Sequence, residues 1–448
     1  MTTRLARLTA LALARAMLAG SPTAAGLAAR MRACLDSQAA WCTVAAQRYA
    51  RLPGEQWRRL SVRSLARLLE ADEAYRQAWA AEDPALRPYP RRYILREANG
   101  IQAPPLGLEH CPLPPLPHGG ALAEWLKIPQ GGLWRLTLPA AMQRRASLGD
   151  QHYRNHLLAK RSGGWRLLEV PHPYLMGLQR RLLDGLLAPV PAHEAACGYR
   201  RGQSVLDHAR AHVGQPVVLR FDLQDFFATV RASRIHALFA TLGYSEQVAR
   251  ELTALTTVAT PEPVLQRLHQ EGGLSFAQIQ RLRDPHLPQG APTSAALANL
   301  AAFRLDLRLQ GLAETLGARY TRYADDLVFS GPASLRQAAL RIEAWVGRIA
   351  IEEGFALNHR KTRSLGAGHR QSVCGIVVNE KPNLPRDEFD RLKAILHNCL
   401  QHGPASQNRE GHTDWRAHLT GRVAWAAQLN PAKALRLQSV LVRIDWTI

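Results

Sequence analysis

Lysine, cysteine and long apolar runs are all scarce in this sequence of 448 residues. The six cysteines are scattered and form no C-x-x-C pair, which excludes a zinc ribbon or a disulfide framework and favours a reducing, cytoplasmic location. No apolar stretch approaches the roughly eighteen residues of a membrane span. Arginines at positions 4, 7 and 15 make the N-terminal Ala/Leu run an amphipathic helix rather than a signal peptide. We therefore expect a soluble protein with no membrane partner.

Positive charge is abundant, since 57 Lys and Arg residues face 36 Asp and Glu, a formal net charge of +21. Such an excess favours a polyanionic partner, because each phosphate contact releases condensed counterions. A basic surface without a cognate ligand is the alternative. Only six of the basic residues are lysines, so a lysine at a candidate site stands out.

The first part of the chain predicts helices. Residues 1–100 are rich in Ala, Leu and Arg with helical spacing, as in 61–79. The Pro-rich stretch 103–117 cannot continue a helix and is typical of a linker. We predict an N-terminal, mostly helical extension over 1–140.

From residue 150 onward the pattern changes to a mixture of strands and helices. Strands are predicted at 165–170 and 217–223, and two short strands around a tight turn within 317–331. Helices are predicted at 173–190 and 339–355. This mixture indicates an α+β domain with an antiparallel sheet.

Three aspartates mark a candidate site. Asp222 lies at the end of the predicted strand VVLRF, and Asp325 and Asp326 stand together at the predicted turn. Taken singly, each is an ordinary turn or capping residue. Adjacent carboxylates repel unless a cation lies beside them, and oxygen ligands of this kind suit Mg²⁺. Two such ions about 3.5–4 Å apart can promote an in-line phosphoryl displacement.

Three motifs carry a resemblance to a known family. Residues 323–326 (YADD), 221–227 (FDLQDFF) and 287–294 (LPQGAPTS) are similar, in this order, to the metal-binding and nucleotide-pocket motifs of reverse transcriptases. The resemblance covers about 150–448. It implies an α+β right-hand polymerase, with fingers and a palm with an antiparallel sheet over 141–370 and a primer grip and helical thumb over 371–448.

The resemblance also implies a metal site. Asp222, Asp325 and Asp326 would bind two Mg²⁺ ions, with the Leu223 carbonyl as a backbone ligand. Lys361, in NHRKTR, would donate a proton to the departing pyrophosphate.

The nucleotide site is implied in the same way. Phe227 would lie against the sugar and exclude a 2′-hydroxyl, so the substrates would be dNTPs, while one ring of the Phe226–Phe227 pair is expected in the core. A solvated basic turn is the alternative for the residues around 162–164. The implied nucleotide-binding residues are Lys160, Arg161, Arg166, Asp225, Phe226, Phe227, Gln289 and Gly290.

The stretch 193–204 and the LPQGAPTS wording resemble the bacterial retron subgroup. This implies a structured noncoding RNA as template and, through a 2′-hydroxyl, as primer, an RNA–DNA hybrid product, an effector protein encoded nearby and a role in phage defence. Two elements depart from the retron pattern: N-A-x-x-H is replaced by 208–212 (HARAH), and V-T-G by 373–375 (VCG). The residues implied to face the RNA are His208, His212, Val373, Cys374 and Gly375.

Other functions stay open at this point. A defence-associated reverse transcriptase outside the retrons and a template-independent nucleotidyl transferase would both use the same site. A catalytically idle RNA-binding protein is opposed by the three aspartates, because a pure binder has no use for mutually repelling carboxylates.

Overall fold

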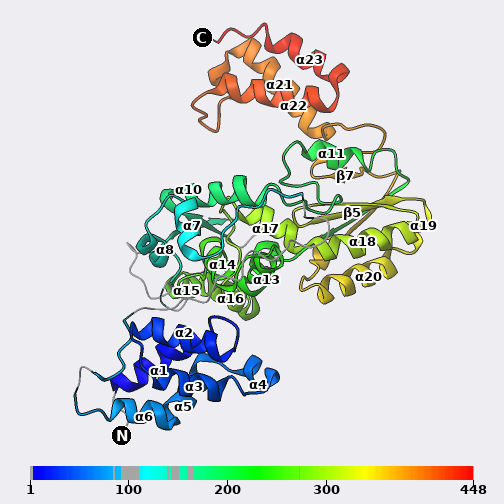
Figure 1. The fold of residues 1–448 in the computed structure, drawn as a ribbon. Helices are drawn as coiled ribbons and strands as arrows, with labels where there is room; N and C mark the ends of the chain where they lie inside the picture. Colours follow the sequence, from blue (N-terminus) through cyan, green and yellow to red (C-terminus); the bar gives the residue numbers. More distant parts are fainter. Residues whose placement is uncertain are drawn as a thin grey trace. The chain divides into compact units, whose positions relative to one another are not determined.

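The computed structural model describes residues 4–83, 86–91, 108, 110–138, 142, 151–159, 165–271 and 273–446 (Figure 1). The chain divides into two compact units, Met1–Ala103 and Pro104–Ile448. The predicted three-part division at 140 and 370 stays a prediction. Throughout the described ranges, no helix has the length and apolar character needed to cross a membrane.

The described part of the first unit is helical, which confirms the predicted N-terminal helical region. Its helices are α1 (Arg4–Met17), α2 (Ala24–Leu35), α3 (Trp41–Tyr49), α4 (Gly54–Arg59), α5 (Val62–Ala71) and α6 (Glu73–Trp79). Apolar side chains at helical spacing form its core, among them Leu13, Met17, Leu27, Met31, Leu65 and Leu69. Asp72 caps α6 and pairs with Arg48 at 2.8 Å, which ties α3 to α6.

The second unit is built on an antiparallel sheet with strand order β4-β5-β3-β6. Its strands are β3 (Val217–Asp222), β4 (Arg319–Tyr323), β5 (Asp326–Gly331) and β6 (Arg363–Gly366). Side chains alternate between the two faces along β3, so Val217, Leu219 and Phe221 lie in one hydrophobic core and Val218 lies in another. The predicted antiparallel sheet is confirmed, and both of its faces are covered.

Helices before and after the strands supply the larger core. The predicted helices at 173–190 and 339–355 are found, although the first changes to a π-helix at Leu183–Leu187. Helices α18 and α20 lie beside the sheet (Figure 1). The helices of this part are α7 (Gly119–Trp125), α8 (Gln130–Leu136), α10 (Pro173–Leu182), α11 (Val205–Arg210), α12 (Phe226–Thr229), α13 (Ala232–Thr241), α14 (Glu246–Thr256), α15 (Glu262–Gln270), α16 (Phe276–Arg283), α17 (Ser294–Ala301), α18 (Phe303–Thr315), α19 (Ser334–Gln337) and α20 (Ala339–Glu352).

Two hairpins and a helical C-terminal part complete the unit. The hairpins are β1 (Tyr153–Ala159) with β2 (Trp165–Pro171), and β7 (Ser372–Val373) with β8 (Ile376–Val377). The C-terminal helices are α21 (Arg386–His402), α22 (Trp415–Leu429) and α23 (Pro431–Leu441). Their apolar faces pack with Val373 and Ile376 and with Val218 of the sheet. The second hairpin therefore lies between the sheet and the C-terminal helices.

Candidate active site

The three predicted aspartates meet at one end of the central sheet. Asp222 is the last residue of β3, and its register partner is Asp326, the first residue of β5. Asp325 lies in the two-residue turn from β4 to β5, where Ala324 has a φ of 55°. The Leu223 N–H donates to the Asp325 carbonyl at 2.8 Å. Strand register and one tight turn thus position all three carboxylates.

A buried arginine, which sequence reasoning missed, supports this turn. Arg322 is fully buried and donates two hydrogen bonds to Asp306, at 2.8 and 2.6 Å. It also donates to the Ala324 carbonyl at 3.1 Å. Burial disfavours the charge on Arg322, but Asp306 outweighs it and raises the pKa of the guanidinium. Arg322 therefore stays charged and holds the turn residue that adopts a positive φ. The available signal was its place on β4, two residues after buried Tyr320.

The segment of residues 195–198, which precedes α11, packs against the same turn. The Cys197 N–H donates to the Arg322 carbonyl, and the Arg322 N–H donates to the Ala195 carbonyl. A Cβ at Gly198 would come within 3.0 Å of the Ala324 nitrogen. This close approach explains the glycine in the ACGY sequence, because a side chain would push the turn away.

Two cations neutralise part of the carboxylate charge. Lys361 Nζ lies 2.8 Å from Asp222, and the Arg220 guanidinium lies 2.8 Å from Asp326. Burial, followed by the charge of Asp222, raises the pKa of Asp325. Burial also raises the pKa of Asp326, although Arg220 opposes the shift. Three crowded oxygen donors that remain under mutual repulsion fit a hard divalent cation, which would replace the two side-chain cations as counter-charge.

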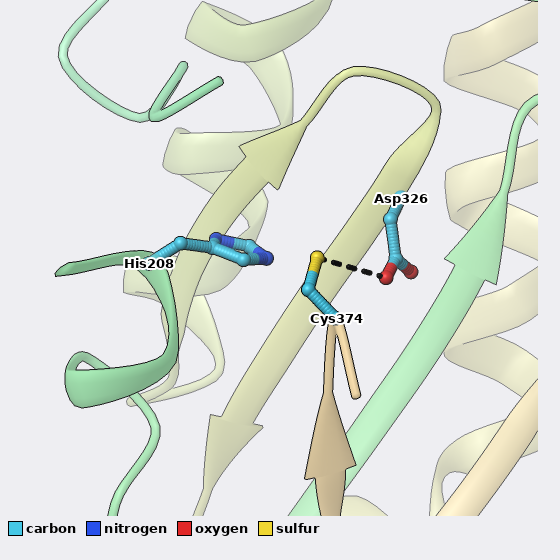
Figure 2. Close-up of side chains that lie close together, drawn as sticks. All are labelled: His208, Asp326 and Cys374. Carbon is cyan, nitrogen blue, oxygen red and sulfur yellow. Dashed lines mark hydrogen bonds between the residues drawn. The ribbon is translucent and has the colours of Figure 1, made fainter. Parts of the chain in front are cut away.

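A second group of potential metal ligands includes Asp326. The ligand atoms of His208, Asp326 and Cys374 all lie within 4.8 Å of one another (Figure 2). Cys374 Sγ is 3.6 Å from Asp326 Oδ2. Sequence reasoning assigned His208 and Cys374 to RNA contact, and it did not foresee that they lie beside Asp326, one of the predicted metal ligands.

Burial speaks against part of the predicted RNA-facing set. His208, His212 and Val373 are all 0% exposed. His212 is hydrogen-bonded to Ser330 at 2.7 Å and to Thr321 at 2.6 Å. Burial lowers the pKa of His208 to about 4 and that of His212 to about 3, so both rings are neutral near pH 7. These three side chains hold the sheet to α11 and the second hairpin instead of facing solvent.

Cys374 and Gly375 occupy the turn of that hairpin, where Gly375 is exposed. Both residues have a positive φ, 47° at Cys374 and 82° at Gly375. A two-residue turn with two positive φ values matches the type I′ hairpin, which explains the glycine. Of the residues predicted to face RNA, these two are the ones with exposed surface.

The structure describes six of the eight predicted nucleotide-binding residues, and their side chains differ in exposure. Lys160 and Arg161 lie outside the described residues, whereas Arg166 is exposed on β2. Phe226 is buried and stacks on Phe355. It is therefore the ring of the pair that belongs to the core, and its burial speaks against nucleotide contact. Phe227 is half-buried with its ring 6.5 Å from that of Tyr199, so it keeps the surface that a sugar contact needs.

Asp225 and the loop of Gln289 complete this set. The Asp225 carboxylate pairs with Arg281 at 2.9 Å. The Gln289 carbonyl accepts from the Glu169 N–H at 2.9 Å, so the pocket loop is bonded to β2. Gly290 has a φ of 132°, and a Cβ there would come within 3.1 Å of the Glu169 carbonyl oxygen. The glycine is required by this close approach of two backbones.

A second buried ion pair, also missed from the sequence, lies behind that loop. His286 Nε2 is 2.9 Å from Glu169 Oε2, and the two side chains are 1% and 2% exposed. The Thr260 hydroxyl donates to the other Glu169 oxygen at 2.7 Å. Burial acts to lower the pKa of His286, but Glu169 outweighs it and raises the pKa. The pair connects β2 to the segment that leads into Gln289.

Comparison with known proteins now decides the family. Residues 158–377 match the family model described as reverse transcriptase (RNA-dependent DNA polymerase). These residues form a reverse transcriptase domain. The predicted resemblance is thereby confirmed, and the antiparallel sheet with its three aspartates lies within the matched residues.

Relatives with similar sequences come from retrons. The retron Mx65 reverse transcriptase of Myxococcus xanthus is 42% identical over 288 residues, which cover 64% of each chain. The retron Mx162 enzyme of the same organism is 35% identical over 66% of this chain and 61% of its own. The chain thus spans somewhat less than two thirds of the length of these relatives. Among solved structures, a telomerase from Candida albicans in complex with a telomeric RNA fragment matches with 10% identity and a TM-score of 0.33, covering 65% of this chain and 58% of that one.

Proposed function

We propose that this protein is a retron-type RNA-directed DNA polymerase that copies a partner noncoding RNA into DNA. The observation that carries the proposal is the register pairing of Asp222 with Asp326, which sets both carboxylates beside Asp325 at one sheet end. The similarity to retron reverse transcriptases supports the same reading. In the right-hand description, the hairpin β1–β2 and its neighbouring helices form the fingers, the central sheet the palm, and α21–α23 the thumb.

The proposed cofactor is a pair of Mg²⁺ ions held by Asp222, Asp325, Asp326 and the Leu223 carbonyl. When bound, the ions would activate the attacking hydroxyl and stabilise the leaving oxygen. The protein contributes rigid carboxylates, because strand register and the anchored turn fix their positions before substrate arrives. Lys361, now paired with Asp222, would be released toward the departing pyrophosphate and donate a proton there.

Nucleotide selection is assigned to residues around this edge. Phe227 would exclude the 2′-hydroxyl, and Gln289 with Gly290 would line the pocket of the new base pair. Lys160, Arg161 and Arg166 would hold the triphosphate, and Asp225, through Arg281, would shape the approach to it. These roles follow the reverse transcriptase pattern and are proposals for this chain.

The partner is proposed to be a structured RNA, and the product an RNA–DNA hybrid. The net charge of +21 supports a polyanionic ligand. The hybrid would be bound through its shape and backbone along the C-terminal helices. Six free thiols in the described residues accord with a cytoplasmic location. An effector encoded nearby and a role in phage defence belong to the same proposal.

Primer extension on defined RNA templates tests the activity. The purified chain is expected to add dNTPs in the order that each template dictates, and two templates that differ at one position should give products that differ at the complementary position. Products unrelated to the template would instead support a template-independent nucleotidyl transferase. No product with any template, together with retained RNA binding, would support an idle RNA-binding protein.

A further inference from the structure

The two departures from the retron pattern meet at one point in space. His208 stands where that pattern has Asn, and Cys374 stands where it has Thr. The two positions are 166 residues apart in the sequence, yet their side chains point toward one another and toward Asp326 (Figure 2). Both replacements introduce a side chain that binds soft or borderline metals, imidazole in one case and thiol in the other.

The geometry of these three side chains is close to that of a metal site. Their ligand atoms lie within 4.8 Å of one another, and Cys374 Sγ is already 3.6 Å from an Asp326 oxygen. Tetrahedral zinc, with bonds of about 2.0–2.3 Å, separates its ligands by about 3.3–3.8 Å. A contraction of about 1 Å would bring the set to that spacing.

His208 gives the second, independent indication. Its side chain is fully buried, and its Nε2 has no hydrogen-bond partner within the described part of the chain. Its Nδ1 is bonded to the Thr321 hydroxyl at 2.7 Å. A metal-binding histidine has this arrangement, with one ring nitrogen fixed by a hydrogen bond and the other free for the ion. A buried, unsatisfied ring nitrogen is otherwise costly.

We propose that His208 Nε2, Cys374 Sγ and an Asp326 oxygen bind a thiophilic divalent cation of the zinc class. Binding would form three metal–ligand bonds, and the thiol proton would pass to solvent. The inference rests on the proposed function in one respect: Asp326 would serve two sites, so zinc would withdraw it from the Mg²⁺ set and halt DNA synthesis. The site would make this polymerase sensitive to free zinc.

Asp326 also forms an ion pair with an arginine, and zinc would compete with this pair. Arg220 lies 2.8 Å from Asp326 Oδ2, the oxygen that also lies near Cys374. The cation can displace this guanidinium or use the other carboxylate oxygen, for which no bond competes among the described residues. The thiolate formed on binding offsets one of the two positive charges that the cation adds.

Cobalt spectroscopy on the full-length, metal-free protein tests binding without reference to activity. Co²⁺ is expected to give the intense thiolate charge-transfer absorption and the visible bands of a tetrahedral site, and Zn²⁺ should abolish them. Cys374→Thr and His208→Asn, which restore the retron residues, are expected to weaken Co²⁺ binding at least about tenfold. Cys111→Ser, at another half-buried cysteine, is the matched control and should bind like the wild type. Absence of the thiolate band, or its persistence in Cys374→Thr, would overturn the proposal.

Inhibition of primer extension tests the consequence. Each variant is compared with its own zinc-free rate, because His208→Asn could disturb packing. Zinc is expected to inhibit the wild type and Cys111→Ser equally, and Cys374→Thr to need at least about tenfold more. Raising Mg²⁺ should increase the zinc concentration required, since both ions compete for Asp326. Equal zinc sensitivity in all variants would show that zinc acts only on the carboxylates and would overturn the shared-site proposal. A protein that binds Co²⁺ through Cys374 but makes no DNA would contradict the proposed function alone.

Discussion

Arg322 is the residue whose replacement tests the architecture of the turn. Arg322 and Asp306 are both fully buried and joined by two hydrogen bonds, and Arg322 also donates to the Ala324 carbonyl. Replacing Arg322 by Met leaves the Asp306 carboxylate buried without its partner. Breaking such a buried pair from one side costs about 3–5 kcal/mol. We expect Arg322→Met to lower the free energy of unfolding by that amount.

Two further variants separate the effect of the buried charges on stability from the effect of side-chain packing. The double variant Arg322→Met, Asp306→Leu removes both charges and is expected to recover much of the loss, since a buried pair is often neutral relative to apolar residues. Arg319→Met, on the same strand but exposed, should change stability by about 0.5 kcal/mol or less. Urea denaturation of all three variants gives the comparison. Equal losses in Arg322→Met and Arg319→Met would refute the claim that this pair anchors the turn. The double variant should still be slower than the wild type in primer extension, because the Ala324 carbonyl has lost the hydrogen bond from Arg322.

Four further outcomes are expected. Asp325→Asn and Asp326→Asn should abolish nucleotide addition in primer extension while RNA affinity in a gel shift changes little; synthesis in both variants would disprove the metal assignment. Phe227→Ala should reduce the preference for dNTPs over rNTPs by at least about tenfold, or about 1.4 kcal/mol, measured as the ratio of kcat/KM values. The core variant Phe226→Leu should leave that ratio near the wild-type value. Because the pKa of His286 is raised in the folded state, its pair with Glu169 should stabilise fully below the unfolded value of about 6.5 and lose its effect as pH rises through the raised value. The stability difference between wild type and Glu169→Gln should therefore shrink with rising pH, and a pH-independent difference would exclude a charged His286. Lys361→Met should slow nucleotide addition by about 10²-fold, with Lys361→Arg less affected; equal rates in wild type and Lys361→Met would remove the proton-donor role.

The sequence allowed the local parts of this structure to be predicted. The β-branched run before Asp222 and the paired aspartates after Tyr323 predicted the strands and the turn, because period-two burial and turn chemistry are local signals. The partners of buried charges were not predictable in this way. Arg322 meets Asp306, 16 residues earlier, across a helix–strand contact, and Glu169 meets His286, 117 residues later.

The burial of His208 and His212 could not be predicted for the same reason. The resemblance to retron enzymes assigned their segment to RNA contact, but the sequence alone does not show how deeply the two side chains are buried. Their rings are buried because Thr321 and Ser330, on neighbouring strands, supply hydrogen bonds. A polar residue at an inward-facing position is informative only once its distant partner is known.

The most direct test of the central claim is to sequence the nucleic acid that copurifies with the protein from cells. A retron-type reverse transcriptase should carry DNA whose sequence is complementary to a partner RNA and which is joined to that RNA, and the Asp325→Asn variant should carry the RNA alone. DNA unrelated to the bound RNA, or the same DNA on the Asp325→Asn variant, would contradict the account.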